Sequence, residues 1–183
     1  MARNIEIKAR LADPDGAREA VAALADRGPI RIAQDDSFFH CENGRLKLRA
    51  FDDGTGELIF YRRADQAGPK ESFYVRSRTA DPDELREALA LAYGIVGRVR
   101  KLRSLYWVGR TRVHLDRVDD LGEFLELEVV LAQEEPAQAG IQEARELITR
   151  LGIAEDALID RAYVDLLSDA TCAHAGLPGD DQR

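Results

Sequence analysis

The sequence predicts an α+β fold in which an eight-stranded, mainly antiparallel sheet carries helices against its apolar face. The first observation is the unbroken alternation of apolar and polar residues over residues 3–11, RNIEIKARL. Ile5 and Ile7 lie on one face of the predicted strand, and Glu6 and Lys8 lie on the other. The second observation is that the same alternation returns in several later segments. These strands therefore share one design, with an apolar face and a charged face.

The charged strand faces allow two interpretations. In an open antiparallel sheet they point to water, which is the common arrangement for such alternation. In a closed barrel they point inward, and helices cover the apolar outer face. Carboxylates and cations would then meet in the lumen, which suits a polyanion bridged by a hard divalent cation.

Capping and turn signals set the order of the elements. Asp13-Pro14 and Asp81-Pro82 each combine an N-cap with proline at the first helical position, which predicts two amphipathic helices. A third helix is predicted over residues 136–151 and a shorter helical segment over 154–167. The predicted strands cover residues 3–11, 30–41, 45–51, 57–63, 70–79, 96–107, 110–117 and 122–131.

Neighbouring arginines leave the inner face of the fourth strand open to two assignments. Leu58, Phe60 and Arg62 share one face of this strand, and we take that face as the inner one on a family resemblance given below. Arg63 would take its place after a shift of one residue, because such a shift turns every side chain to the other face.

Composition excludes several classes of protein. The chain has 183 residues and a formal net charge of −8, which argues against a broad nucleic-acid-binding surface or an anionic-membrane surface. The sequence lacks a membrane span and a signal-peptide core, so a cytoplasmic protein is expected. Cys41 and Cys172 are predicted to be free thiols. A P-loop and a GxSxG motif are both missing from the sequence, and the three histidines lack metal-ligand spacing.

Several blocks resemble one known family. The segment Asn4-Ile5-Glu6-Ile7-Lys8 resembles the ExExK signature of the CYTH superfamily, which includes class IV adenylyl cyclases, thiamine triphosphatases and other triphosphate tunnel metalloenzymes. The runs KLRSLY at 101–106, VHLD at 113–116 and LGEFLELE at 121–128 are similar to its K-x-R, LD and LGxFxEIE blocks. The resemblance implies a closed antiparallel eight-stranded β-barrel, a triphosphate tunnel, with helices outside it. It implies a single domain over residues 1–168, and residues 169–183 are expected to form a disordered tail.

The resemblance also implies roles for charged residues. The residues implied in catalysis are Glu6, Lys8, Lys101 and Arg103. The residues implied in phosphate binding are Lys8, Lys47, Arg49, Arg62, Lys101, Arg103 and Arg112. A Mg²⁺ or Mn²⁺ ion would be held by Glu6, Glu126 and Glu128, with Asp116 as a further ligand or as support for the others. The expected partner is a small-molecule triphosphate, and the oligomeric state stays open, with a homodimer as one option.

Three functions stay open. The preferred one is a class IV-type adenylate cyclase that converts ATP to cyclic AMP and pyrophosphate. The alternatives are a triphosphatase acting on thiamine triphosphate, inorganic triphosphate or a nucleoside triphosphate, and a non-catalytic nucleotide- or polyphosphate-binding module. The third is retained because Asn4 replaces the first glutamate of the signature and Ser72 stands where the family often has an acidic residue.

Two expectations concern the lumen itself. Glu126 and Glu128 lie two apart on one strand face, so their like charges should repel, and Glu126→Ala should cost little stability. His114 shares a face with Arg112 and Asp116, where it is either a satisfied lumen histidine or a general base.

Overall fold

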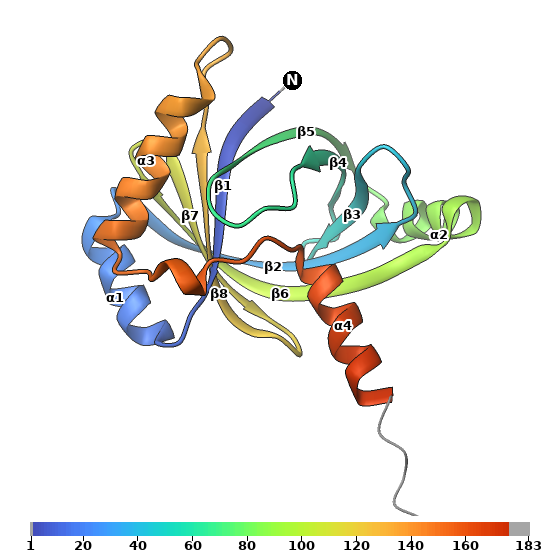
Figure 1. Cartoon of the computed structure of the whole chain (residues 1–183). Coiled ribbons are helices and arrows are strands. Elements are labelled where there is room, and N and C mark those ends of the chain that lie inside the picture. The colour runs from blue at the N-terminus through green and yellow to red at the C-terminus, as the bar shows by residue number, and fades with distance from the viewer. Residues whose placement is uncertain (1, 176–183) are drawn as a thin grey trace, which may run out of the picture.

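The computed structural model describes residues 2–175, and its central feature is a closed antiparallel barrel of eight strands (Figure 1). Neighbouring strands follow the order β1-β5-β4-β3-β2-β6-β7-β8, and β8 pairs with β1 to close the barrel. The strands are β1 Ala2–Arg10, β2 Arg27–Phe39, β3 Arg45–Phe51, β4 Gly56–Arg63, β5 Lys70–Thr79, β6 Ile95–Val108, β7 Thr111–Val118 and β8 Gly122–Val130. The predicted eight-stranded barrel with external helices is therefore confirmed.

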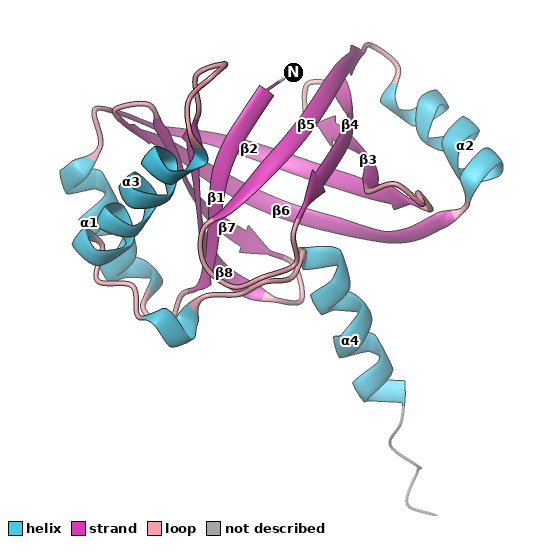
Figure 2. Cartoon of the chain, turned by 45° about the horizontal axis from the view of Figure 1, so that its top comes forward, coloured by secondary structure: helices cyan, strands magenta, loops and turns pink. Residues whose placement is uncertain are grey.

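Four α-helices lie outside the barrel in the described part of the chain. They are α1 Pro14–Leu24, α2 Pro82–Tyr93, α3 Ala137–Arg150 and α4 Tyr163–Ala175, and a short 3-10 turn, Glu155–Ala157, precedes α4. Figure 2 shows α1 and α3 side by side on one flank of the barrel, with α2 beyond the opposite flank. None of these helices is long and apolar enough to cross a membrane.

Helix α3 and the outer faces of β1 and β8 form the main core. Ile5 and Ile7 of β1 point away from the lumen and are almost fully buried with Leu147 of α3. Gly140 permits this close approach, because an added Cβ would lie 2.7 Å from side-chain atoms of Ile5 and Leu131. The apolar half of the alternation is thus covered by helices, which leaves the polar half to line the lumen.

Helix α4 begins at one end of the barrel rather than on its flank. Its first residue, Tyr163, packs against Phe124 of β8, with ring centroids 4.9 Å apart. The helix continues to Ala175, so Asp169–Ala175 do not form the start of a disordered tail as expected. Within it, Thr171 Oγ1 donates a hydrogen bond to the carbonyl of Leu167, at 2.9 Å. The rest of the expected tail, residues 176–183, lies outside the described residues.

Candidate active site in the barrel lumen

The barrel holds a cavity of about 280 Å³ whose lining includes many charged side chains. Among the described residues, eight cationic side chains line it: Lys8, Lys47, Arg49, Arg63, Arg76, Lys101, Arg103 and Arg112. Five carboxylates line it with them: Glu6, Asp36, Glu57, Glu126 and Glu128. The lumen is therefore richer in cations than in anions, although the chain as a whole is acidic.

The predicted inner faces of β1, β3, β6 and β8 are confirmed. Lys8, Lys47, Arg49, Lys101 and Arg103 all line the cavity. The reason is parity, since residues two apart on a strand point to the same side. Arg112 also lines the cavity, as do Glu6, Glu126 and Glu128.

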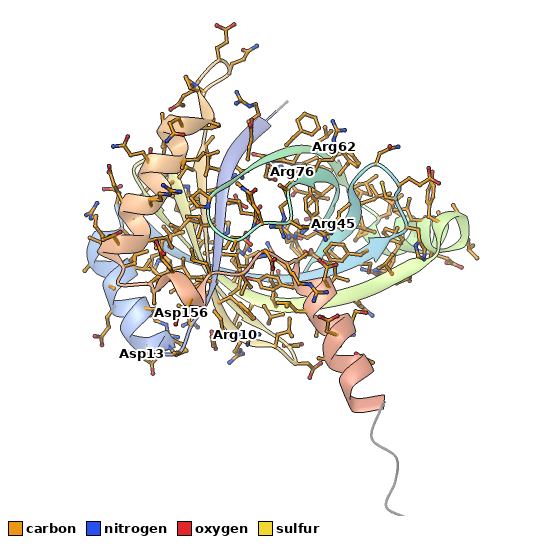
Figure 3. The ribbon with its side chains drawn as sticks, in the orientation of Figure 1. Arg10, Asp13, Arg45, Arg62, Arg76 and Asp156 are labelled. Carbon is orange, nitrogen blue, oxygen red and sulfur yellow. The ribbon has the colours of Figure 1, made fainter. Side chains whose placement is uncertain are left out.

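The predicted inner face of β4 is wrong by one residue. Arg63 lines the lumen, with its guanidinium 3.4 Å from Glu6 Oε1. Arg62 is exposed on the outside, over the ring of Phe73, and is labelled in Figure 3. The register with β5 decides the face, because Arg63 lies opposite Ser72, which itself lines the lumen. The sequence alone offered two adjacent arginines and no means to choose between them.

Asp116 binds Arg103 through both carboxylate oxygens. Arg103 Nε and one terminal nitrogen lie 2.6 Å from the two oxygens of Asp116, which is fully buried. Lys101 Nζ lies 3.4 Å from Asp116, and the hydroxyl of Tyr163 donates to it at 3.1 Å. Burial alone would raise the pKa of Asp116, but Arg103 and Lys101 hold it well below its usual range. Asp116 is thus the anion that positions two lumen cations.

Tyr163 is a lumen residue for which the sequence gave only a weak signal. Its ring lies under two ammonium groups, with Lys8 Nζ 3.9 Å and Lys101 Nζ 5.0 Å from the centroid. Both cations gain from the negative face of the ring. The tyrosine at the start of α4 therefore helps to hold two lysines from different strands.

Two cations and a histidine surround Glu126. Lys8 Nζ lies 3.2 Å from Oε2, and Arg103 and His114 Nδ1 lie 3.2 and 3.3 Å from Oε1. Burial would raise the pKa of Glu126, but Lys8 and Arg103 hold it well below its usual range. The expected repulsion between Glu126 and Glu128 is therefore outweighed by these pairs, and removing Glu126 should leave Lys8 and Arg103 short of a partner.

Asp36 is a second lumen carboxylate that binds two cations, and our candidate list omitted it. Lys47 Nζ and Arg49 Nε lie 2.8 and 2.7 Å from its two oxygens. Burial would raise the pKa of Asp36, but Arg49 and Lys47 hold it well below its usual range. Alternation along β2 could have placed Asp36 on the same strand face as Gln34. Its partners on β3 could be found only from the β2–β3 register.

A group of possible metal ligands lies on β7 and β8. Among the described residues, His114, Glu126 and Glu128 form the group of three whose ligand atoms lie within 4.8 Å of one another. The register explains this, since His114 lies opposite Glu126, and Glu6 of β1 lies opposite Glu128. Asn4 Oδ1, buried on β1 with no hydrogen-bond partner, adds a neutral oxygen to the same lumen. Carboxylate, amide and imidazole donors together fit a divalent cation such as Mn²⁺ or Mg²⁺.

Two predicted metal ligands lie outside this group of three. Glu6 lines the lumen but pairs with Arg63, and its role toward a metal stays a prediction. Asp116 is fully buried, binds Arg103 through both oxygens and is not among the residues that line the cavity, which fits the supporting role rather than that of a direct ligand.

A family model for the CYTH domain matches residues 2–163, nearly the whole described chain. The chain belongs to the CYTH domain family. The match begins with β1, includes all eight strands of the barrel and ends at the first residue of α4.

Similar proteins carry related names. Adenylate cyclase CyaB of Aeromonas hydrophila is 29% identical over 168 residues, which cover 87% of this chain and 85% of that protein. A solved protein of Pyrococcus horikoshii superposes with a TM-score of 0.79 at 23% identity, covering 89% of this CYTH chain and 98% of the other. A Hippeastrum protein, described as having a dominant triphosphatase activity, superposes with a TM-score of 0.60 at 18% identity, covering 98% of this chain and 100% of its own.

Asp116→Asn should destabilise the protein strongly. The substitution leaves Arg103 and Lys101 without their shared anion, and breaking one side of a buried ion pair costs about 3–5 kcal/mol. The matched control is Asp35→Asn, because Asp35 also forms a bidentate pair, with Arg98, but near the surface. This control should lower the free energy of unfolding by less than about 1 kcal/mol. Urea unfolding measures both, and equal losses would contradict the role given to Asp116.

The same variant should have a flatter dependence of stability on pH. The pKa of Asp116 is lower in the folded than in the unfolded chain, so its stabilisation is complete above the unfolded value of about 4 and is lost as pH falls toward the folded value. Unfolding measured between neutral pH and pH 3 should therefore show a steeper loss in the wild type than in Asp116→Asn.

Triphosphate affinity should fall as pH rises above neutrality. Burial, reinforced by Arg103, lowers the pKa of Lys101 to about 7, so the free protein loses this positive charge at higher pH. A bound polyanion favours the charged form, and binding in this range should take up a proton. Lys101→Arg keeps its charge at all accessible pH values and should show a smaller decline. Calorimetric titration with inorganic triphosphate from pH 6 to 9 measures both, and parallel slopes would contradict the prediction.

Proposed function

We propose that this CYTH protein is a metal-dependent enzyme that acts on a triphosphate inside the barrel, and that it is an adenylate cyclase of the class IV type. One observation carries the proposal: eight cationic side chains and five carboxylates line one cavity inside the barrel. A triphosphate supplies the negative charge that such a cavity lacks, and the carboxylates leave room for a divalent cation. The likeness to adenylate cyclase CyaB over most of both chains supports the choice of a cyclase.

Cations at different positions in the lumen would bind different phosphate oxygens. Lys8, Lys101 and Arg103 lie near Tyr163 at one end of the lumen and would bind and orient phosphate oxygens there. Arg63 and Arg112, paired with Glu6 and Glu128, would hold further phosphate oxygens. Fixed cations of this kind stabilise the charge that develops on a departing pyrophosphate without having to reorganise.

His114, Glu126 and Glu128 would hold the divalent cation, with Asn4 as a further oxygen donor. That ion would supply Lewis-acid polarisation of the phosphoryl oxygens. Because Asn4 brings no charge, the site carries one negative charge fewer than a glutamate in its place would give, and we infer a single ion rather than two.

A triphosphatase is the second candidate, and the place of Glu126 favours it. This carboxylate lies 3.2 Å from Lys8 Nζ, at the end of the lumen where two lysines flank Tyr163. A terminal phosphate bound by those lysines would lie beside a carboxylate that could accept a hydrogen bond from an attacking water and orient it. The two reactions share their cations and differ in which phosphorus meets the nucleophile.

Product analysis separates the candidates. The pure protein is incubated with ATP and either Mg²⁺ or Mn²⁺, with inorganic triphosphate and thiamine triphosphate in parallel, and the products are separated by chromatography. We expect cyclic AMP and pyrophosphate from ATP. Orthophosphate would establish the triphosphatase instead, and triphosphate binding without any turnover would reduce the protein to a binding module.

Adjacent arginines on β4 provide a matched pair for testing the lumen as the triphosphate site. Arg63→Leu removes a cation that lines the cavity, and Arg62→Leu removes one exposed outside it. A hydrogen bond to a charged group contributes about 1.5–3 kcal/mol, so Arg63→Leu should weaken triphosphate binding about tenfold or more. Arg62→Leu should leave it unchanged. Equal effects of the two variants, measured by calorimetry on folded protein, would place the ligand elsewhere.

A further inference from the structure

The two ends of the barrel differ in the chemistry of their inward side chains. Toward α4, the inward faces of β2, β6, β7 and β8 carry the apolar residues Phe38, Val99, Val118 and Phe124. They are buried in one cluster with Ala162, Tyr163 and Val164 at the start of α4, and these seven residues are called the end plug below. Several of them line the cavity, so the charged lumen ends on an apolar floor.

Two segments cover the same end of the barrel beside the end plug. They are the β4–β5 loop, residues 64–69, and the segment before α4, residues 158–162. Lys70 Nζ donates to a carbonyl in each of them, that of Gln66 at 2.9 Å and that of Ile159 at 3.5 Å. A buried lysine therefore joins the loop to the C-terminal segment.

Arg45 of β3 makes a second connection between the loop and α4. Its guanidinium lies 3.1 Å from a carboxylate oxygen of Asp65 in the loop and 2.7 Å from one of Asp165 in α4. Asp165 Oδ2 also accepts a hydrogen bond from the backbone N–H of Ala162, at 3.1 Å, which caps the helix. The start of α4 is thus fixed to both the loop and the barrel.

The exposure of the lumen side chains rises toward the other end of the barrel. On β7 the exposed fraction of the side chain increases from 4% at His114 to 22% at Arg112. On β5, Lys70 is 2% exposed, whereas the side chain of Arg76 is 47% exposed. Water therefore reaches the lumen from the end that carries Arg76 and Arg112, which is called the mouth below.

We infer that the lumen has a single entrance, at the mouth, and that the product formed at its floor is the last to leave. The inference rests on the proposed function and extends it from the reaction to the order in which products depart. The end plug lies directly behind the deepest cations, because the Tyr163 ring centroid is 3.9 Å from Lys8 Nζ and 5.0 Å from Lys101 Nζ. A product at the floor can then reach water only past the position of the other product.

The charges of the floor orient the ligand. A triphosphate enters with its terminal phosphate first, because an uncharged substituent at the floor would leave Lys8 and Lys101 without the negative charge of the ligand. These cations and Arg103 are buried, so their charge-assisted hydrogen bonds to phosphate oxygens are stronger than those at the exposed mouth. The floor therefore holds its product more tightly than the mouth does.

Both candidate reactions leave one product at the floor and one toward the mouth. In a cyclase, the ribose hydroxyl oxygen bonds to the α-phosphorus and releases its proton, and pyrophosphate departs with the electron pair of the broken bond. In a triphosphatase, a water oxygen bonds to the terminal phosphorus and the diphosphate is the leaving group. The floor product is then pyrophosphate in the first case and orthophosphate in the second.

The first test locates the entrance through two exposed arginines. Arg78 lies two residues beyond Arg76 on the same face of β5, at the mouth, and does not line the cavity. Arg117 lies next to Val118 of the end plug, on the outer face of β7. The ten residues of β5 extend about 30 Å, whereas the Debye length is about 8 Å at physiological ionic strength, so each charge acts at its own end.

Arg78→Glu should lower the association rate constant of inorganic triphosphate about threefold or more and change its dissociation little, because a charge at the rim acts mainly on association. Arg117→Glu makes the same change of charge at the plugged end and should alter neither rate. Stopped-flow mixing without divalent cation, followed by the fluorescence of Trp107, the single tryptophan, measures both variants. Equal effects of the two variants would mean entry from both ends and would overturn the inference.

The second test determines the order of product release. Initial rates are measured with each product added in turn, at a constant concentration of free divalent cation. The floor product should raise KM and leave kcat unchanged, because it competes with substrate for the empty lumen. The mouth product should lower kcat, because it blocks the exit while the floor product is still bound. Two products that raise only KM, or the reverse pattern, would contradict ordered release.

The outcomes separate this inference from the proposed function. Triphosphate binding with equal effects of Arg78→Glu and Arg117→Glu overturns the single entrance and leaves the triphosphate site standing. Turnover with unordered release does the same. If the folded wild type binds no triphosphate, the proposed function fails, and this inference fails with it.

Discussion

The mutual neutralisation of buried charges inside the barrel is the constraint on which the rest of this structure depends. Because side chains alternate along a strand, every second one points inward, and in this chain thirteen of the inward side chains are charged. A charge removed from water is tolerated only when an opposite charge and hydrogen bonds replace the water. The bidentate pairs of Asp116 with Arg103 and of Asp36 with Arg49 satisfy this condition. They also fix the orientation of the guanidinium groups that a ligand would meet.

The same alternation imposes a second requirement on the outside. Closure of the barrel leaves an apolar outer surface, and α1 and α3 cover the part formed by β1, β6, β7 and β8. Gly140 allows α3 to approach β1 closely enough to bury Ile5. Inside and outside are therefore coupled: a one-residue shift of β1 would expose its isoleucines to the lumen and press Glu6 and Lys8 against a helix. Such coupling explains why the barrel has a single register.

Much of this arrangement could be predicted from the sequence, because parity within one strand is local information. The charged faces of β1, β3 and β8 followed from their alternation, whereas the choice of Lys101 and Arg103 on β6 rested on the resemblance to the CYTH superfamily. The same reasoning failed for Arg62 and Arg63, because the register of β4 with Ser72 on β5 decides which of the two points inward. The partners of Asp36 and of Tyr163 lie on other strands, and they cannot be predicted from the residues near either one in the sequence. Local pattern thus predicts which residues enter the lumen, whereas pairing between elements decides which of them touch.

Those contacts also explain why an acidic protein can present a cationic cavity. Carboxylates in the lumen hold cations at fixed positions, and without them Lys101, Arg103 and Arg49 would repel one another. The lowered pKa of Lys101 is the sign that this repulsion and the burial are not fully compensated. A bound polyanion completes the compensation, because the five lining carboxylates and Asp116 behind them still fall short of eight cations. The cavity is therefore organised before a ligand arrives, and its remaining imbalance selects for ligands that carry several negative charges.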